Sequence, residues 1–162
     1  MIPDYLLLAE RIQQEVDDLA QVVTRTERAI HAAQHHAEDS DLFIDAAALN
    51  LHDFFAGLER IFQQITTHVD GNMPSGHGWH RKLLDQMQVD LPNLRPPVLS
   101  NETAEALDEF LRFRHVVRNV YAFQFDAERI QRLVSQMRPT FTQVQAELKQ
   151  FALLLQQISG EE

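Results

Sequence analysis

The sequence contains no cysteine among its 162 residues. This absence excludes a disulfide-stapled scaffold, a thiolate nucleophile and any zinc or iron–sulfur site ligated by cysteine. No apolar run approaches the roughly 20 residues that a membrane-spanning helix needs. The apolar patch near the N-terminus is short and soon followed by acidic residues, which is unlike a secretory leader. We therefore expect a cytoplasmic protein without a membrane-spanning segment.

Glycine and proline are also scarce, with five and six copies respectively. Together they make up about 7% of the chain, against roughly 12% on average, and so few turn formers argue against an all-β fold. Apolar residues instead recur at spacings of three and four. We expect residues 1–162 to form a single all-α domain, an up-and-down helical bundle of four long helices and one short helix.

Capping residues, prolines and one glycine-rich segment set the expected helix boundaries. The helices are expected from Pro3 and Asp4 to about His36, from the cap candidates 38–41 to a loop at 68–78, from Trp79 to about Val89, from Glu102 to about Phe123, and from Asp126 to Ile158. Ser100 is a good N-cap after a proline-rich extended segment. Pro139 predicts a kink or break in the last helix.

Two apolar stripes are expected to pack in the core. The stripe of the second helix comprises Leu42, Phe43, Ala46, Leu49, Phe54, Phe55, Leu58, Ile61, Phe62 and Ile65. The stripe near the C-terminus comprises Leu148, Phe151, Leu154, Leu155 and Ile158, and a seam for a partner helix is its alternative role.

Basic residues are fewer than acidic ones, and the excess of acidic residues is unevenly distributed along the chain. The net charge is −10, of which residues 1–70 carry −9 through four Lys or Arg and thirteen Asp or Glu. The rest of the chain is nearly neutral and holds local basic clusters. This distribution excludes a general nucleic-acid coat but leaves room for a local phosphate-binding patch.

The densest cluster of polar functional groups lies in the segment FLRFRHVVRNVYAF, residues 110–123. Its members are Arg112, Arg114, His115, Arg118, Asn119 and Tyr121. At about 100° per residue, a helix would place Arg114, His115, Arg118, Asn119 and Tyr121 on one broad face, with Phe113, Val116 and Val120 facing the other way. Two guanidiniums on one face suit phosphate binding, and a histidine beside them can move a proton near neutral pH. These are the groups needed to cleave RNA without a metal ion, with the ribose 2′-hydroxyl as nucleophile. A solvated face, or pairing with acidic residues of the same fold, is the alternative.

Four segments together resemble the HepT-like branch of the HEPN superfamily. They are LNLHDFFAGLERIF (49–62), PSGHGWHRKLLDQM (74–87), LRPPVLS (94–100) and FRHVVRNVYAFQFD (113–126). The resemblance covers roughly residues 45–130. It implies an all-α HEPN bundle that dimerises, so that the motif helices of two subunits face each other across one composite groove. It further implies the toxin or ribonuclease subunit of a toxin–antitoxin pair, acting on RNA without a cofactor or metal, and a minimal nucleotidyltransferase as the antitoxin partner.

The family motif is an arginine, a polar residue, three further residues, a histidine, any residue and a tyrosine. In this chain Arg114 takes the arginine position, His115 the polar position and Tyr121 the tyrosine position. Asn119 stands where the family has its histidine, and an amide cannot act as a general base. His115 lies one helical turn before Asn119, which makes it the candidate acid–base group.

The resemblance assigns roles to this segment. Arg112, Arg114 and Arg118 are the candidate RNA phosphate ligands, and Arg114, His115, Arg118, Asn119 and Tyr121 are the candidate catalytic set. In relatives the antitoxin transfers AMP to the motif tyrosine, so Tyr121 is also a candidate AMP acceptor. Asn119 favours a catalytically inactive binding subunit or AMP-accepting partner as the alternative function. A helical adaptor without a nucleic-acid role is a third, favoured by the net charge.

Three further groups of residues contain histidines, and each has a structural interpretation beside a functional one. His77 and His80 flank Trp79 and could suggest a metal site. The favoured interpretation is that Gly76 and Gly78 allow a tight turn into a short helix, which Trp79 anchors on the bundle. For His31, His35 and His36, capping of the negative C-terminal end of the first helix is favoured over a metal site. Among Asn50, His52, Asp53 and Glu59, one residue is expected to orient Arg114 or Arg118; the sequence does not say which.

Overall fold

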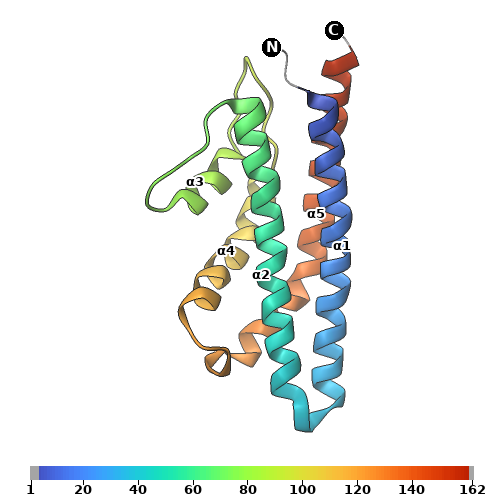
Figure 1. Cartoon of the computed structure of the whole chain (residues 1–162), viewed down its shortest axis with the longest axis vertical. Coiled ribbons are helices and arrows are strands. Elements are labelled where there is room, and N and C mark those ends of the chain that lie inside the picture. The colour runs from blue at the N-terminus through green and yellow to red at the C-terminus, as the bar shows by residue number, and fades with distance from the viewer. Residues whose placement is uncertain (1–3, 161–162) are drawn as a thin grey trace.

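The computed structural model describes residues 4–160, and these residues are helical almost throughout (Figure 1). The α-helices are α1 (Tyr5–His35), α2 (Ser40–Ile65), α3 (Trp79–Gln86), α4 (Asn101–Asn119) and α5 (Ala127–Gly160). Short helical turns occur at η1 (Ala37–Asp39), η2 (Thr66–Asp70, a π-helical turn) and η3 (Ala122–Gln124). The described residues contain no named strand, only one isolated bridge between Leu91 and Arg95. The predicted all-α bundle of four long helices and one short helix is confirmed.

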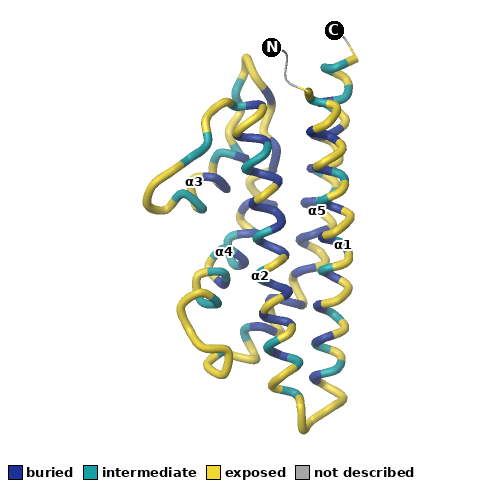
Figure 2. The backbone as a smooth tube through the Cα atoms, in the orientation of Figure 1, coloured by how far each residue is buried: buried dark blue, intermediate teal, exposed yellow. Residues whose placement is uncertain are grey.

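The long helices α1 and α2 form an antiparallel hairpin, and α2 separates two groups of neighbours (Figure 1). On one side α5 lies along α1, while α3 and α4 pack on the other side of α2. Their buried faces join in one continuous apolar core, whose residues are the dark blue stretches of the tube in Figure 2. Helix α2 is therefore the element that presents side chains to both α3 and α4.

The predicted stripes pack mostly as expected. Leu148, Phe151 and Leu155 are buried in the core, which confirms that the C-terminal stripe packs internally. On α2, however, the expectation is wrong for Ala46, which is exposed, and for Leu42 and Leu49, which are 61% and 59% exposed. Leu42 and Leu49 lie on the N-terminal turns of α2, before its buried phenylalanines. They are seven residues apart and therefore lie on the same side of the helix.

Two predicted boundaries need correction. Helix α4 ends at Asn119, four residues before Phe123, because Val120 is extended and the Asn119 side-chain amide donates to the carbonyl oxygen of His115 at 2.6 Å. Tyr121 therefore lies outside the helix. Of the kink or break expected at Pro139, the break does not occur, since α5 continues through the proline. A long packed helix tolerates the loss of one backbone hydrogen bond when its apolar face stays buried on both sides of the proline.

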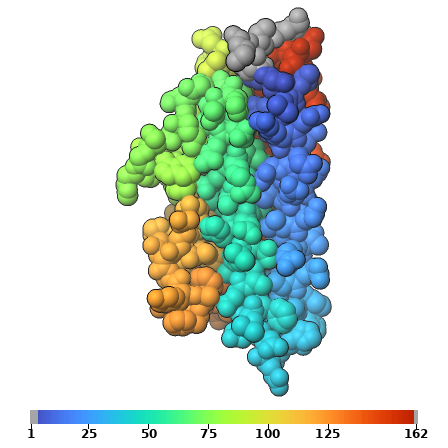
Figure 3. Space-filling view, viewed as in Figure 1, coloured from blue at the N-terminus to red at the C-terminus, as the bar shows by residue number. Residues whose placement is uncertain are grey.

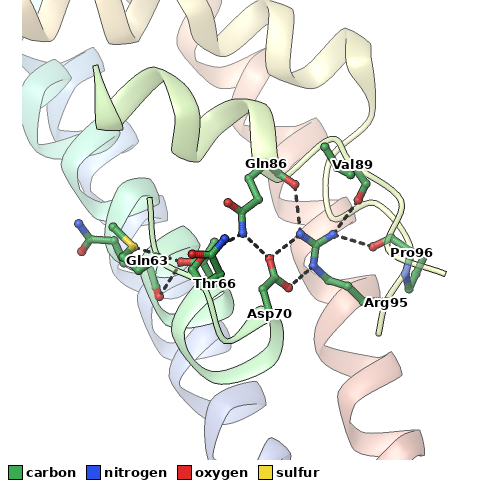
Figure 4. Close-up of polar contacts among 9 residues, drawn as sticks. Gln63, Thr66, Asp70, Gln86, Val89, Arg95 and Pro96 are labelled. Atoms are coloured by element: carbon green, nitrogen blue, oxygen red, sulfur yellow. Dashed lines mark hydrogen bonds and ion pairs between the residues drawn. The ribbon is translucent and has the colours of Figure 1, made fainter. Parts of the chain in front are cut away.

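A buried ion pair between Asp70 and Arg95 anchors the segment that connects α2 to α4 (Figure 4). The Arg95 guanidinium donates to both carboxylate oxygens of Asp70, at 2.7 and 2.8 Å, and the two side chains are 1% and 2% exposed. Arg95 also donates to the carbonyl oxygens of Gln86, Val89 and Pro96, and the Gln86 amide donates to Asp70 at 2.8 Å. This network fixes the position of α3 relative to the end of α2.

The entry into α3 follows the predicted glycine geometry. Gly76 and Gly78 both have positive φ angles, of 82° and 73°, which L-residues rarely adopt. Gly78 is the residue that immediately precedes the helix. The turn brings Trp79 against the core and sets the direction in which the next residue, His80, leaves the backbone.

Candidate phosphate-binding site

Helix α4 runs antiparallel to α2 (Figure 1), and its orange atoms lie against those of α2 in Figure 3. It presents Arg114 to a buried carboxylate of α2. Glu59 of α2 is only 8% exposed at its side chain, and its Oε1 lies 3.3 Å from Nε of Arg114. Its other oxygen, Oε2, lies 2.5 Å from Nδ1 of His80 on α3. One buried acid thus connects three helices. Of the four α2 residues considered from the sequence, Glu59 is the one that orients Arg114.

This contact sets the electrostatics of the arginine. Arg114 is 17% exposed at its side chain, so its charge is held close to the surface while most of its hydrocarbon stem is covered. Among residues 4–160 its terminal guanidinium nitrogens donate no hydrogen bond. The carboxylate restricts the rotation of the guanidinium. The remaining N–H groups of the guanidinium can still donate to an anion.

His80 is a site residue that sequence reasoning missed. It was considered only as a metal ligand, but its Nδ1 is engaged with Glu59, and its ring lies 3.6 Å from that of Trp79, centroid to centroid. Within residues 4–160 there is no group of three or more His, Cys, Asp or Glu placed to hold a metal ion. The available signal was Glu59 itself, because an acid inside an apolar stripe must find a partner when it is buried.

The three candidate phosphate ligands differ in their surroundings. Arg112 is exposed and pairs with Asp108 one turn earlier on α4, at 2.9 Å, so part of its charge is already neutralised. Arg118 is exposed, and in the described part of the chain no carboxylate lies within ion-pair distance of it. Arg118 and Arg114 are one turn apart and therefore form the cationic pair of this face.

His115 and Asn119 contact each other as their spacing predicted. The Asn119 amide nitrogen lies 3.4 Å from Nδ1 of His115 and donates to the His115 carbonyl oxygen at 2.6 Å. Both side chains are exposed at the end of α4. The imidazole of His115 is therefore beside the Asn119 amide and open to solvent.

Tyr121 does not share the helical face on which the sequence placed it. It follows the end of α4 in extended conformation, is 74% exposed, and stacks on Phe123 with the ring planes 8° apart. The loop that carries it is held by two hydrogen bonds between Tyr121 and Gln124, both of 2.9 Å. Because Tyr121 follows Arg118 by only three residues, it stays within about 10 Å of chain length of the cationic pair.

His52 of α2 is a second histidine near the two arginines. Its pKa is lowered from the ordinary value of 6.5, first by burial and then by the positive charge of Arg114, with a smaller contribution from Arg118, while Asp53 and Glu59 oppose the shift. Its Nε2 is buried and has no hydrogen-bond partner among the described residues. The imidazole is therefore neutral at pH 7 and adds no charge to the site.

This shift predicts a loss of stability in mild acid. Since the folded protein holds a proton on His52 less tightly than the unfolded chain does, stability is unaffected well above pH 6.5 and falls as the pH drops below 6.5. A His52→Gln variant should lose less stability than the wild type between pH 7.5 and about pH 5. Urea unfolding at both pH values measures this. Equal losses for the two proteins would show that His52 is not the group responsible.

The arrangement defines a helical protein in which one end of α4 presents two arginines one turn apart, Arg114 paired with Glu59 and Arg118 exposed. No described helix combines the length and the apolar character that crossing a membrane requires. A family model described as HepT-like protein matches residues 46–155. The chain therefore belongs to the HepT-like family, which is HEPN-type and toxin-like. No curated protein and no solved structure matches it.

Proposed function

We propose that this chain is the toxin component of a toxin–antitoxin pair and acts as a metal-independent endoribonuclease in the cytoplasm. The observation that carries the proposal is the Arg114 guanidinium held by buried Glu59, one turn from Arg118, with His115 at the same helix end. These groups supply two cations for an RNA phosphate and one imidazole for proton transfer. The family's association with nucleotidyltransferase partners supports a minimal nucleotidyltransferase as the antitoxin.

The proposed reaction is an attack by a ribose 2′-hydroxyl on the adjacent phosphorus. His115 accepts the proton of the 2′-hydroxyl as the new oxygen–phosphorus bond forms. Arg114 and Arg118 stabilise the negative charge of the pentacoordinate phosphorane. The bond from phosphorus to the 5′-oxygen then breaks, and this oxygen takes a proton from water or from the imidazolium. The products are a 2′,3′-cyclic phosphate and a 5′-hydroxyl end.

Dimer formation is part of the proposal. Leu42 and Leu49 form an exposed apolar stripe on the outer side of α2, the helix that also carries Glu59. A second copy packed against this stripe would remove two large apolar side chains from water and bring two cationic faces close together. We therefore assign the active form as a homodimer with one composite groove.

Variants of the cationic face test the catalytic proposal. In EDTA, the wild type should cleave labelled single-stranded RNA, and both Arg114→Ala and His115→Ala should reduce the rate by about 100-fold or more, because each removes a group that stabilises the transition state. Arg11→Ala, an exposed arginine of α1, is the matched control and should keep the wild-type rate. Cleavage that survives in His115→Ala would contradict the role assigned to this histidine.

A non-catalytic member of the family is the second candidate, favoured by Asn119 at the histidine position. In that case Tyr121 acts as the AMP acceptor, and its 74% exposure leaves the hydroxyl reachable by another protein. AMP bound there would place bulk and negative charge beside Arg118. RNA binding without cleavage, together with transfer of label from ATP to the wild type but not to Tyr121→Phe in the presence of the nucleotidyltransferase, would establish this alternative.

A further inference from the structure

We infer that the Tyr121–Phe123 pair is a stacking platform for an unpaired RNA base next to the phosphate-binding arginines. The inference rests on the proposed function and deepens it, because it names single-stranded RNA as the substrate class. It concerns Phe123 in particular, a residue that the family motif does not include.

The first observation is the exposure of the two rings. Phe123 is 83% exposed and Tyr121 is 74% exposed, the two highest values among the exposed large apolar side chains. Phe125 of the same loop, by contrast, is packed against the core. Two neighbouring aromatic rings left in water on a protein with a well-filled core indicate a surface that binds something.

The second observation is the geometry of the pair. The ring planes differ by 8° and the centroids are 5.7 Å apart, so the rings are parallel and offset. The loop is held in this shape by the paired hydrogen bonds between Tyr121 and Gln124 and by the Phe125 amide, which donates to the Ala122 carbonyl oxygen at 3.0 Å. Such a platform offers flat π-faces that every nucleobase can use without losing much conformational entropy.

The third observation decides between a base and an apolar protein surface. The platform begins three residues after Arg118, whose charge has no carboxylate partner among residues 4–160, and η3 packs against α2, the helix that carries Glu59. The nearest acid along the chain, Asp126, is occupied in accepting hydrogen bonds from the first amides of α5. A flat aromatic surface near in sequence to an unneutralised guanidinium matches the chemistry of a nucleotide, which presents both a base and a phosphate.

Binding of a short single-stranded RNA tests the platform. A 2′-O-methyl group on every ribose removes the nucleophile, so affinity is measured without cleavage. A second oligonucleotide carries an abasic ribose at one central position. At low salt, the wild type should bind the intact strand about tenfold more tightly than the abasic strand, and Phe123→Ala should lose this difference. Phe123→Trp should retain it.

Leu153→Ala provides the matched control, because it truncates another exposed apolar residue, which lies on α5. It should bind both strands as the wild type does. Equal affinities of wild type and Phe123→Ala for the intact strand would overturn the platform while leaving phosphate binding intact. No binding of either strand by the wild type would overturn the proposed function and the platform together. A change in oligomeric state of Phe123→Ala, with the preference for the intact strand kept, would assign the pair to a contact between copies.

Discussion

Replacement of Arg95 with methionine is expected to destabilise the protein by about 3–5 kcal/mol. Asp70 is 2% exposed, and five hydrogen bonds of Arg95 join it to three backbone carbonyls and this carboxylate. Methionine fills a similar volume but leaves the Asp70 carboxylate buried without its counter-ion. Urea unfolding, followed by circular dichroism, measures the change in the free energy of unfolding.

Two further variants separate charge burial from the loss of packing. Combining Arg95→Met with Asp70→Leu should restore part of the stability, because both buried charges are then removed while three backbone carbonyls still lack their donor. Arg138→Met breaks the Arg138–Glu27 pair, whose side chains are 50% and 40% exposed, and should cost less than about 1 kcal/mol. If Arg95→Met costs no more than Arg138→Met, the buried pair does not hold α3 in place.

Replacement of Glu59 with alanine is expected to lower RNA cleavage by about 100-fold, even though Glu59 does not touch the RNA. The carboxylate positions Arg114 and is itself bonded to His80, so its removal releases the guanidinium from the place where the phosphate would bind. A displacement of about 1 Å at a catalytic group is enough for a loss of this size. Cleavage rates in EDTA, measured alongside urea unfolding, separate this effect from a loss of fold.

The controls for Glu59 use its own neighbours and a surface pair. Glu59→Gln keeps an oxygen acceptor for Arg114 and should retain more activity than alanine. His80→Ala removes one of the two partners of Glu59 and should fall between the wild type and Glu59→Ala. Glu15→Ala breaks the exposed pair with Arg60 and should leave cleavage unchanged. Full activity in Glu59→Ala would show that Arg114 needs no positioning residue.

The sequence predicts the helices well because apolar periodicity is a local property of the chain. It predicts their ends less well, as α4 shows. Asp and Glu near its start and arginines along it are typical of a helix, yet the helix stops at Asn119, where a side-chain amide takes up a backbone carbonyl and Val120 becomes extended. That small difference removes Tyr121 from the helical face and exposes it together with Phe123.

The candidate site is predictable only where its residues are close in sequence. His115 and Asn119 are four residues apart, and helical geometry brings them together as expected. The His80–Glu59 contact joins residues 21 apart, and the Asp70–Arg95 pair joins residues 25 apart. Such pairs depend on how α3 packs on α2, which periodicity does not specify. Burial of an acid in an apolar stripe signals that a partner exists but does not identify it.

The chemical nature of the ends of RNA cut in EDTA tests the central claim most directly. If Arg114, Arg118 and His115 direct the 2′-hydroxyl to the phosphate, the upstream fragments end in 2′,3′-cyclic phosphate, and these ends disappear with Arg114→Ala. Fragments that end in a 3′-hydroxyl, or cleavage that requires an added divalent cation, would contradict the account.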